Sequence, residues 1–167
     1  ANQRMLKYYN KTITPQQSES AVKTAKKAGV DVVVGSFIVG APTETREEIQ
    51  KTLEFAQRLD IDIPQFNILG AFPGIDLWEE LKVKGLLNEE QHWETGVRIP
   101  DISIDTVPLE EIENMIKQCY KRFLLRPPFI FKQLLSTATS PYRMNVAISN
   151  MSNLGSILES ISHLSEL

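Results

Sequence analysis

The stretch that decides the fold is Val32-Val-Val-Gly-Ser-Phe-Ile-Val-Gly-Ala-Pro-Thr-Glu-Thr-Arg-Glu-Glu48, an apolar run that leads through a turn into a helix. Residues 32–39 are apolar and mostly β-branched with little alternation, which predicts a strand covered on both faces in a parallel sheet. Residues 40–42 end this strand, and Thr45 followed by Glu48 predicts a capping box. Because the C-terminal ends of parallel strands hold ligands in α/β proteins, this turn is the first candidate site.

Helices are predicted on both sides of this strand. Thr14-Pro-Gln-Gln17 is typical of a capped helix start with proline at the first position, and Gly29 predicts that this helix ends near residue 28. A face of small side chains predicts that the helix packs closely on a sheet. This face consists of Val22, Ala25 and Ala28. The helix after the turn, residues 46–59, turns one apolar stripe toward the same sheet. The stripe consists of Ile49, Leu53, Ala56 and Leu59.

A second strand is predicted over residues 66–72, followed by the turn Pro73-Gly74 and a helix over residues 76–84 that Gly85 ends. This alternation of helices and strands predicts right-handed βαβ units with a parallel sheet. Two strands alone leave long unpaired edges. We therefore expect the chain to be part of a larger barrel or sheet.

The remainder of the chain changes character after Gly85. We expect an irregular connecting segment over residues 86–107 and a strongly periodic helix over residues 108–124. Arg126-Pro-Pro128 breaks that helix, and two further helices are predicted over residues 129–135 and 145–164. Residues 1–85 would thus carry the βα units, and residues 108–167 would form a mainly helical extension.

The composition limits the classes of function. The 167 residues are 42% apolar and carry a net charge of −3, so they can bury a core but lack the concentrated basic surface that nucleic acids attract. We expect no membrane span and a cytoplasmic location. The single cysteine, Cys119, excludes an internal disulfide and any multi-cysteine metal site within this chain. Cys119 lies on an apolar helix stripe, which favours a small buried side chain.

Glycine and proline turns provide the candidate ligand contacts. Gly40 permits a close approach of a ligand or a neighbouring backbone, and it also suits a tight turn that binds nothing. Pro73 and Gly74 have the same two interpretations, and equivalent turns after neighbouring strands favour a shared site. Glu44 is placed to bind a ligand hydroxyl or amine, or to act as a favourable charge near the start of a helix.

Catalytic and metal-binding motifs are not evident. The sequence has no Ser/His/Asp or Gly-x-Ser-x-Gly arrangement and no phosphate loop, and His92 has no second ligand at a metal-binding spacing. The residues by themselves therefore predict a ligand-binding face with no catalytic and no metal-binding residue.

Several segments, read in order, resemble the C-terminal half of a radical S-adenosylmethionine (SAM) core. They are Asn2-Gln-Arg-Met-Leu-Lys-Tyr-Tyr-Asn-Lys11, Thr14–Gln17, Ala25-Lys-Lys-Ala-Gly-Val30, Phe37-Ile-Val-Gly-Ala-Pro-Thr-Glu-Thr45 and Gly70-Ala-Phe-Pro-Gly74. The resemblance covers roughly residues 2–85. It is closest to the cobalamin-binding subgroup that includes the anaerobic Mg-protoporphyrin IX monomethyl ester cyclases.

The resemblance implies a partial (β/α)6 TIM-type barrel to which this chain supplies the fifth and sixth strands. It also implies that residues 36–40 lie along the adenosine of SAM and that residues 72–74 contact the adenine. The cofactor-binding residues expected on this basis, with Glu44 from the turn, are Ser36, Phe37, Ile38, Gly40, Glu44, Phe72, Pro73 and Gly74. Two residues depart from the family pattern, because Thr43 stands where glycine is common and Ile75 where threonine is common.

The family's [4Fe–4S] cluster is held by three cysteines on the first barrel strand, and this chain has only Cys119. We therefore expect a fragment of a radical SAM enzyme that is inactive alone, with the cluster and any cobalamin bound outside this chain. Its partners would be the N-terminal half of the same polypeptide and a small-molecule substrate, and the open sheet edge would favour self-association. The alternative is a non-enzymatic α/β module that binds a small ligand or assembles with a partner.

Overall fold

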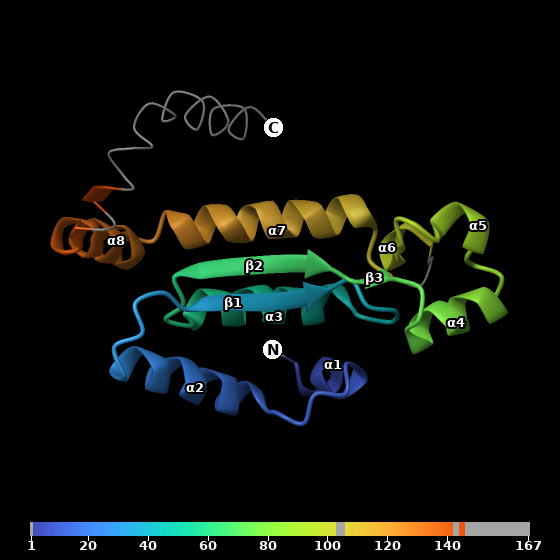
Figure 1. The fold of residues 1–167 in the computed structure, drawn as a ribbon, viewed down its shortest axis with the longest axis horizontal. Helices are drawn as coiled ribbons and strands as arrows, with labels where there is room; N and C mark the ends of the chain where they lie inside the picture. The colour runs from blue at the N-terminus through green and yellow to red at the C-terminus, as the bar shows by residue number, and fades with distance from the viewer. Residues whose placement is uncertain (1, 103–105, 142–143, 146–167) are drawn as a thin grey trace. The chain divides into compact units, whose positions relative to one another are not determined.

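The computed structural model describes residues 2–102, 106–141 and 144–145 (Figure 1). The chain divides into two compact units, residues 1–122 and 123–167, and the boundary falls inside helix α7. The first unit contains every strand of the described residues and all the candidate site residues.

Two parallel strands form the centre of the first unit. β1 (Val34–Val39) pairs with β2 (Ile63–Ile68) in parallel, with Val34 opposite Ile63 and Val39 opposite Ile68. Helix α3 (Arg46–Arg58) connects them and lies behind them in Figure 1. A second, smaller sheet pairs β3 (Gly70–Ala71) with β4 (Val97–Arg98) in antiparallel orientation. β1, α3 and β2 thus form one parallel β-α-β unit, and the described strands form no closed barrel.

The other helices of this unit are α1 (Gln3–Tyr8), α2 (Pro15–Lys27), α4 (Asp76–Val83), α5 (Glu89–His92), α6 (Ile99–Ile102) and the first part of α7 (Leu109–Leu124). The predicted helix signals are confirmed. Thr14 with Gln17 and Thr45 with Glu48 form capping boxes, and Gly29 and Gly85 have the left-handed φ angles that follow α2 and α4.

Helices α3 and α7 cover the same face of the β1–β2 sheet. Residues from all three elements share one buried cluster, namely Val39, Ile49, Leu53, Ile112 and Cys119. The predicted stripe of α3 is confirmed, because its members are all buried. Cys119 is a buried thiol with 3% exposure, which confirms its assignment as a small core side chain.

The opposite face of the β1–β2 sheet corrects one prediction. We expected β1 to be covered on both faces, but its residues alternate between exposed and covered, and Val34 is 53% exposed. Ile63, which pairs with Val34 on β2, is 50% exposed. The described residues therefore do not cover both faces of this apolar run. An apolar strand face without a cover is typical of a sheet that receives further structure.

The second strand begins earlier than predicted. It covers residues 63–68 instead of 66–72, because Asp62 accepts a hydrogen bond from Val33 N at 2.8 Å and so starts the pairing with β1. After Leu69 the chain leaves this sheet, and residues 70–71 pair with β4. The segment expected to be irregular, residues 86–107, likewise contains α5, β4 and α6 within its described part. It packs against α4 through a second buried cluster that includes Trp78, Leu87 and Ile99.

Helix α2 corrects another prediction. Its small side chains were expected to pack closely on the sheet, yet α2 has no buried residue. It is held at its C-terminal end instead, where Lys26 forms an ion pair with the buried Asp62 and donates to the carbonyl of Asp31 at 3.0 Å. This contact ties α2 to the start of both strands.

In the second unit, α8 (Pro127–Thr139) begins after Arg126 with proline at its first position, as the Arg126-Pro-Pro128 break predicts. It is longer than the predicted helix over residues 129–135. The predicted helix over residues 145–164 lies almost entirely outside the described residues. Among the described helices, none is both long and apolar enough to cross a membrane.

Candidate functional site

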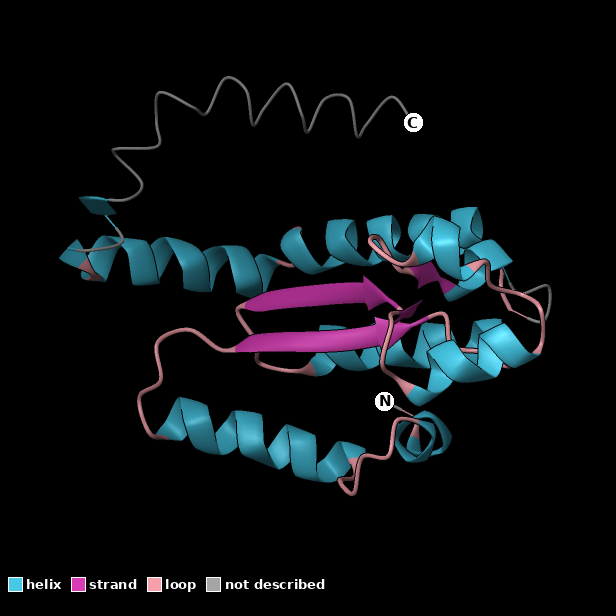
Figure 2. Ribbon diagram, turned by 45° about the vertical axis from the view of Figure 1, so that its right-hand side comes forward, coloured by secondary structure: helices cyan, strands magenta, loops and turns pink. Residues whose placement is uncertain are grey.

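The uncovered face of the β1–β2 sheet is the first part of the candidate site. We call it the open strand face, and it consists of Val34, Ser36 and Ile38 on β1 with Ile63, Gln65 and Asn67 on β2. The register pairs each residue of the first set with one of the second. Figure 2 shows the two strands side by side with their C-terminal ends together. Ligand sites of parallel sheets lie at these ends.

A polar pair lies on this otherwise mainly apolar face. Asn67 Nδ2 donates to Ser36 Oγ across the two strands at 3.2 Å. The hydrogen bond orients the amide, and it leaves the Asn67 carbonyl oxygen and the Ser36 hydroxyl proton available for other groups. Apolar surface with a few placed polar groups is typical of small-molecule sites.

The β1–α3 turn, residues 40–45, is held from inside by Glu44. This side chain is only 2% exposed, and its Oε2 accepts hydrogen bonds from Gly40 N at 2.7 Å and from Ala41 N at 3.1 Å. Since Thr45 is the N-cap, Glu44 lies before the helix and not in its first turn. Glu44 therefore acts on the turn, and the helix-charge interpretation of this residue does not apply.

The second carboxylate oxygen of Glu44 is unusual. Oε1 is buried and finds no hydrogen-bond partner among the described residues, and the same holds for the hydroxyl of Tyr9. Burial raises the pKa of Glu44, while the hydrogen bonds from Ala41 and Gly40 act in the opposite direction. Burial also raises the pKa of Tyr9, and the nearby charge of Glu44 adds to that shift. Buried polar atoms without partners are costly, so these two atoms are suited to binding a further polar group.

Gly40 is required by the backbone at the end of β1. Its φ of 82° is in the left-handed region, and a Cβ atom there would meet Ile112 and Pro100, each at 3.2 Å. Pro100 belongs to α6 and Ile112 belongs to α7. The turn interpretation of Gly40 is therefore sufficient to explain the glycine.

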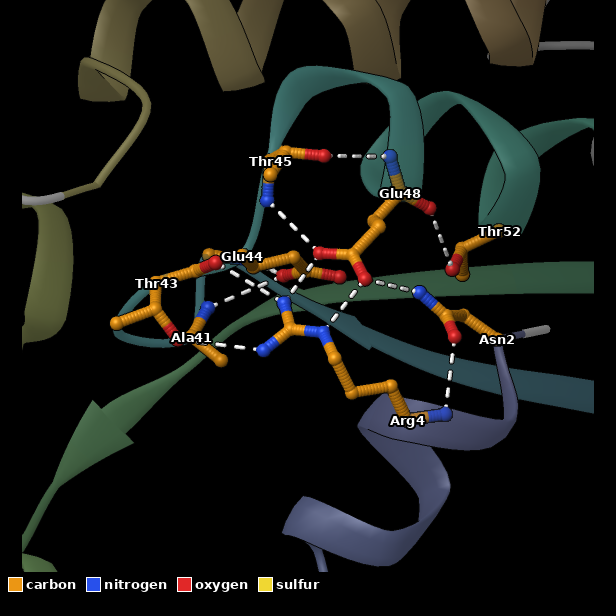
Figure 3. A network of polar contacts seen from close by, with 9 residues as sticks. Asn2, Arg4, Ala41, Thr43, Glu44, Thr45, Glu48 and Thr52 are labelled. Atoms are coloured by element: carbon orange, nitrogen blue, oxygen red, sulfur yellow. Dashed lines mark hydrogen bonds and ion pairs between the residues drawn. The ribbon is translucent and has the colours of Figure 1, made fainter.

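From outside, the same turn is held by Arg4 of α1 (Figure 3). The guanidinium group binds the Glu48 carboxylate through two nitrogens, with Nε to Oε1 at 2.6 Å, and it donates to the carbonyl of Thr43 at 2.9 Å. Asn2 Nδ2 donates to the same carboxylate at 2.5 Å. The hydrogen bond from Arg4 is the main reason that the pKa of Glu48 is lowered to about 2.

The turn after β3, residues 72–74, has a different character. Phe72 is 55% exposed, and its ring lies against Gly70 and Gly96, where added Cβ atoms would come within 3.0 Å and 2.5 Å of it. Gly74 has a φ of 92°, and no atom would contact a Cβ there. An exposed aromatic ring that packs against two glycines is suited to contact a planar apolar group with its free side.

The predicted site residues fall into three groups. Ser36 and Ile38 lie on the open strand face, whereas the ring of Phe37 lies on the covered face, stacked on Phe66 at 5.3 Å between centroids. Gly40 and Glu44 belong to the β1–α3 turn. Phe72, Pro73 and Gly74 form the other turn. Only the backbone of Phe37 is thus near the open strand face.

Sequence reasoning missed three residues of this region: Arg4, Asn67 and Gly96. Asn67 could have been found from the sequence. It lies two positions after Gln65 in an otherwise mainly apolar strand, and the two-residue period of a strand places both polar side chains on one face. Arg4 and Gly96 had none, since their contacts join segments that are distant in sequence.

The described residues do not fit an iron–sulfur cluster. Three cysteines are needed, and the only one in the sequence, Cys119, is buried against α3. In the described ranges no group of three His, Cys, Asp or Glu side chains is arranged to hold a metal ion. A cluster of this kind would therefore need cysteine ligands from outside this chain.

Comparisons with known proteins identify the family to which this region is similar. Residues 1–56 match the model of the Radical SAM superfamily. The chain is 42% identical over 135 residues to an uncharacterised methyltransferase of Pyrococcus horikoshii, an alignment that covers 80% of this chain and 29% of that protein. It is 28% identical over 132 residues to the anaerobic magnesium-protoporphyrin IX monomethyl ester cyclase of Rubrivivax gelatinosus, covering 78% of this chain and 23% of the cyclase.

A third relative is the hopanoid C-2 methylase of Rhodopseudomonas palustris, which is 29% identical over 101 residues, or 60% of this chain and 18% of that protein. The chain thus spans less than a third of the length of each of these curated relatives. The family match includes α1, α2, β1 and most of α3, so it contains the β1–α3 turn with nearly all of this βα unit. Residues 1–56 are therefore similar to part of a radical SAM domain.

Proposed function

We propose that the chain contributes the adenosine side of a SAM site, together with walls of the substrate cavity, to a [4Fe–4S]-dependent radical SAM enzyme. The observation that carries the proposal is the open strand face, which ends at the β1–α3 turn inside the segment that matches the family model. The cluster would be bound by a preceding part of the same polypeptide. A cobalamin domain, if the whole protein has one, would also lie outside this chain.

Individual residues have distinct roles in this proposal. Ser36, Ile38 and the backbone at residues 37–40 would lie along the adenosine, and Phe72 with Pro73 and Gly74 would contact the adenine through apolar surface and backbone. Support for Phe72 comes from its exposed ring. The unpartnered Oε1 of Glu44 would accept a hydrogen bond from a hydroxyl or amine of the bound cofactor, because such a donor removes the cost of a buried lone acceptor.

The first experiment is anaerobic iron–sulfur reconstitution of the longest polypeptide that contains this chain, followed by reduction in the presence of SAM. The proposal predicts a cluster spectrum and formation of 5′-deoxyadenosine. A polypeptide without a Cys-x-x-x-Cys-x-x-Cys stretch before residue 1, or without cofactor cleavage, would contradict the proposal. It would favour the alternative of a non-enzymatic module that binds a small ligand or assembles through the unpaired edge of β1.

The names of the relatives suggest which reaction the whole protein catalyses. Two of the three relatives named above are called a methyltransferase or a methylase, and one is called a cyclase. We propose methyl transfer as the reaction of the whole protein, since the relative with 42% identity has that name. Radical methyl transfer would use two SAM molecules and two electrons from the reductant. One SAM would yield methionine and 5′-deoxyadenosine, which carries the hydrogen atom removed from the substrate, and the other would give its methyl group to the substrate and leave as S-adenosylhomocysteine. A reaction that yields 5′-deoxyadenosine without a methylated product would instead favour the cyclase class.

A further inference from the structure

Thr43 has a backbone conformation that its side chain disfavours. Its φ of 63° lies in the left-handed region, where a β-branched residue is an outlier. Glycine would adopt this conformation without a steric cost. The turn therefore needs other contacts to keep Thr43 in place.

Arg4 supplies such contacts on both chemical groups of Thr43. Its Nη2 donates to the carbonyl oxygen at 2.9 Å, and its Nη1 donates to the hydroxyl oxygen at 3.3 Å. The other side of the guanidinium binds Glu48. A planar guanidinium can serve a carboxylate and a carbonyl together, which the ammonium of lysine does less well.

Glu48 is itself fixed at the start of α3. Its Oε2 accepts from Thr45 N at 3.0 Å, and its own amide donates to Thr45 Oγ1 at 3.3 Å. Asn2 adds a further contact, because its Oδ1 accepts from Arg4 N at 2.9 Å while its Nδ2 donates to Glu48. Arg4 thus connects Thr43 to a rigid helix start (Figure 3).

The conformation of Thr43 determines where Glu44 points. Glu44 follows Thr43 directly, and its carboxylate is turned back over the end of β1 to accept from Gly40 and Ala41. If Thr43 relaxed to a negative φ, the chain direction at Glu44 would change and these two hydrogen bonds would be lost.

We propose that Arg4 is a positioning residue of the β1–α3 turn. By holding Thr43 in the left-handed conformation, Arg4 aims the Glu44 carboxylate at the end of β1 and fixes the backbone that borders the candidate ligand site. The identity of the ligand rests on the function proposed above. The positioning itself does not, since it concerns contacts within this chain.

The test compares amide hydrogen exchange at Gly40 and Ala41, measured by NMR on the chain. Arg4→Met should accelerate exchange at both amides by about 5–30-fold, the factor that corresponds to an unsupported left-handed residue. The matched control is Lys23→Met, which removes another exposed ion pair, with Glu19 on α2, and should change neither amide. Adding Thr43→Gly to Arg4→Met should restore slow exchange, because glycine needs no support there.

A functional measurement separates positioning from general stabilisation. In the longest polypeptide that contains this chain, Arg4→Met should raise the dissociation constant for S-adenosylhomocysteine by up to the same factor, and Thr43→Gly should reverse the change. Unchanged exchange at Gly40 and Ala41 in Arg4→Met, or no rescue by Thr43→Gly, would overturn the proposal. Faster exchange with unchanged affinity would overturn the claim that the backbone held by Arg4 borders the ligand site. If the unaltered polypeptide binds no S-adenosylhomocysteine, the proposed function fails, while the exchange comparison still decides the role of Arg4.

Discussion

The β1–α3 turn and the turn at residues 72–74 look alike in sequence but differ in structure. Both follow a strand and combine glycine with proline. The first is held by Glu44 from inside and by Arg4 from outside, and the second has an exposed phenylalanine and a glycine with open space around it. The β1–α3 turn is therefore held in one conformation by side-chain contacts, whereas the turn at residues 72–74 exposes an aromatic ring that can contact a ligand.

The largest expected difference between the two turns comes from their glycines. Gly40→Ala should lower the free energy of unfolding by about 2–4 kcal/mol, because the new methyl group meets Ile112 and Pro100 and the residue stays left-handed. Gly74→Ala has the same strain without the clash and should cost about 1–2 kcal/mol. Chemical denaturation of both variants measures this. Equal losses would show that the two turns are not packed differently.

The next effect concerns the carboxylate of Glu44. Glu44→Ala leaves the amides of Gly40 and Ala41 without their acceptor and should lower the free energy of unfolding by about 1–3 kcal/mol. Glu44→Gln retains an acceptor oxygen and is the matched control, with a smaller loss expected. Thermal and denaturant unfolding at neutral pH compare them. If the alanine variant were as stable as the glutamine variant, the internal support of the turn would be refuted.

A smaller effect is expected from acid. The pKa of Glu48 is lowered to about 2 by Arg4, so the stability that it contributes is fully present above its ordinary value of about 4.5 and is lost as the pH falls toward 2. Arg4→Met should destabilise the chain at neutral pH, and this difference should shrink across that pH range. Unfolding curves of the unaltered chain and of Arg4→Met between about pH 6 and about pH 2 test this. A difference independent of pH would exclude the Glu48 carboxylate as the partner of Arg4.

The smallest effect on stability is expected at the other turn. Phe72→Ala removes a ring that is half-exposed and should change the free energy of unfolding by less than about 1 kcal/mol. It should nevertheless weaken binding of S-adenosylhomocysteine to the whole polypeptide by about tenfold, as loss of an aromatic contact does. Val83→Ala, at an exposed position of α4, is the control that should change neither quantity. A large loss of stability in Phe72→Ala would mean that the ring is structural.

Local signals predicted much of this fold. The capping boxes at Thr14 and Thr45, the glycine after α2 and the apolar stripe of α3 depend on neighbouring residues only, and the structure confirms each of them. The order of helices and strands in residues 14–85 followed from the same signals, apart from the additional strand β3.

Contacts between distant segments account for the rest. Coverage of β1 depends on which other segments reach it, so an apolar run could not distinguish a sheet covered on both faces from one with an open strand face. The role of Arg4 depends on a contact across 39 positions. The role of Glu44 depends on its carboxylate turning back toward Gly40, only four positions away, and the buried position that favours this orientation depends on the rest of the fold. None of these is encoded in a local pattern.

In the proposed function, residues on the open strand face and at both turns contact the adenosine side of SAM. Hydrogen exchange with mass spectrometry, on the longest polypeptide that contains this chain, tests it by comparison with and without S-adenosylhomocysteine. We expect slower exchange in peptides that cover residues 36–44 and 70–75 and no change in α2, which lies outside the proposed site. Binding that leaves residues 36–44 and 70–75 unprotected, or that protects α2 instead, would contradict the account.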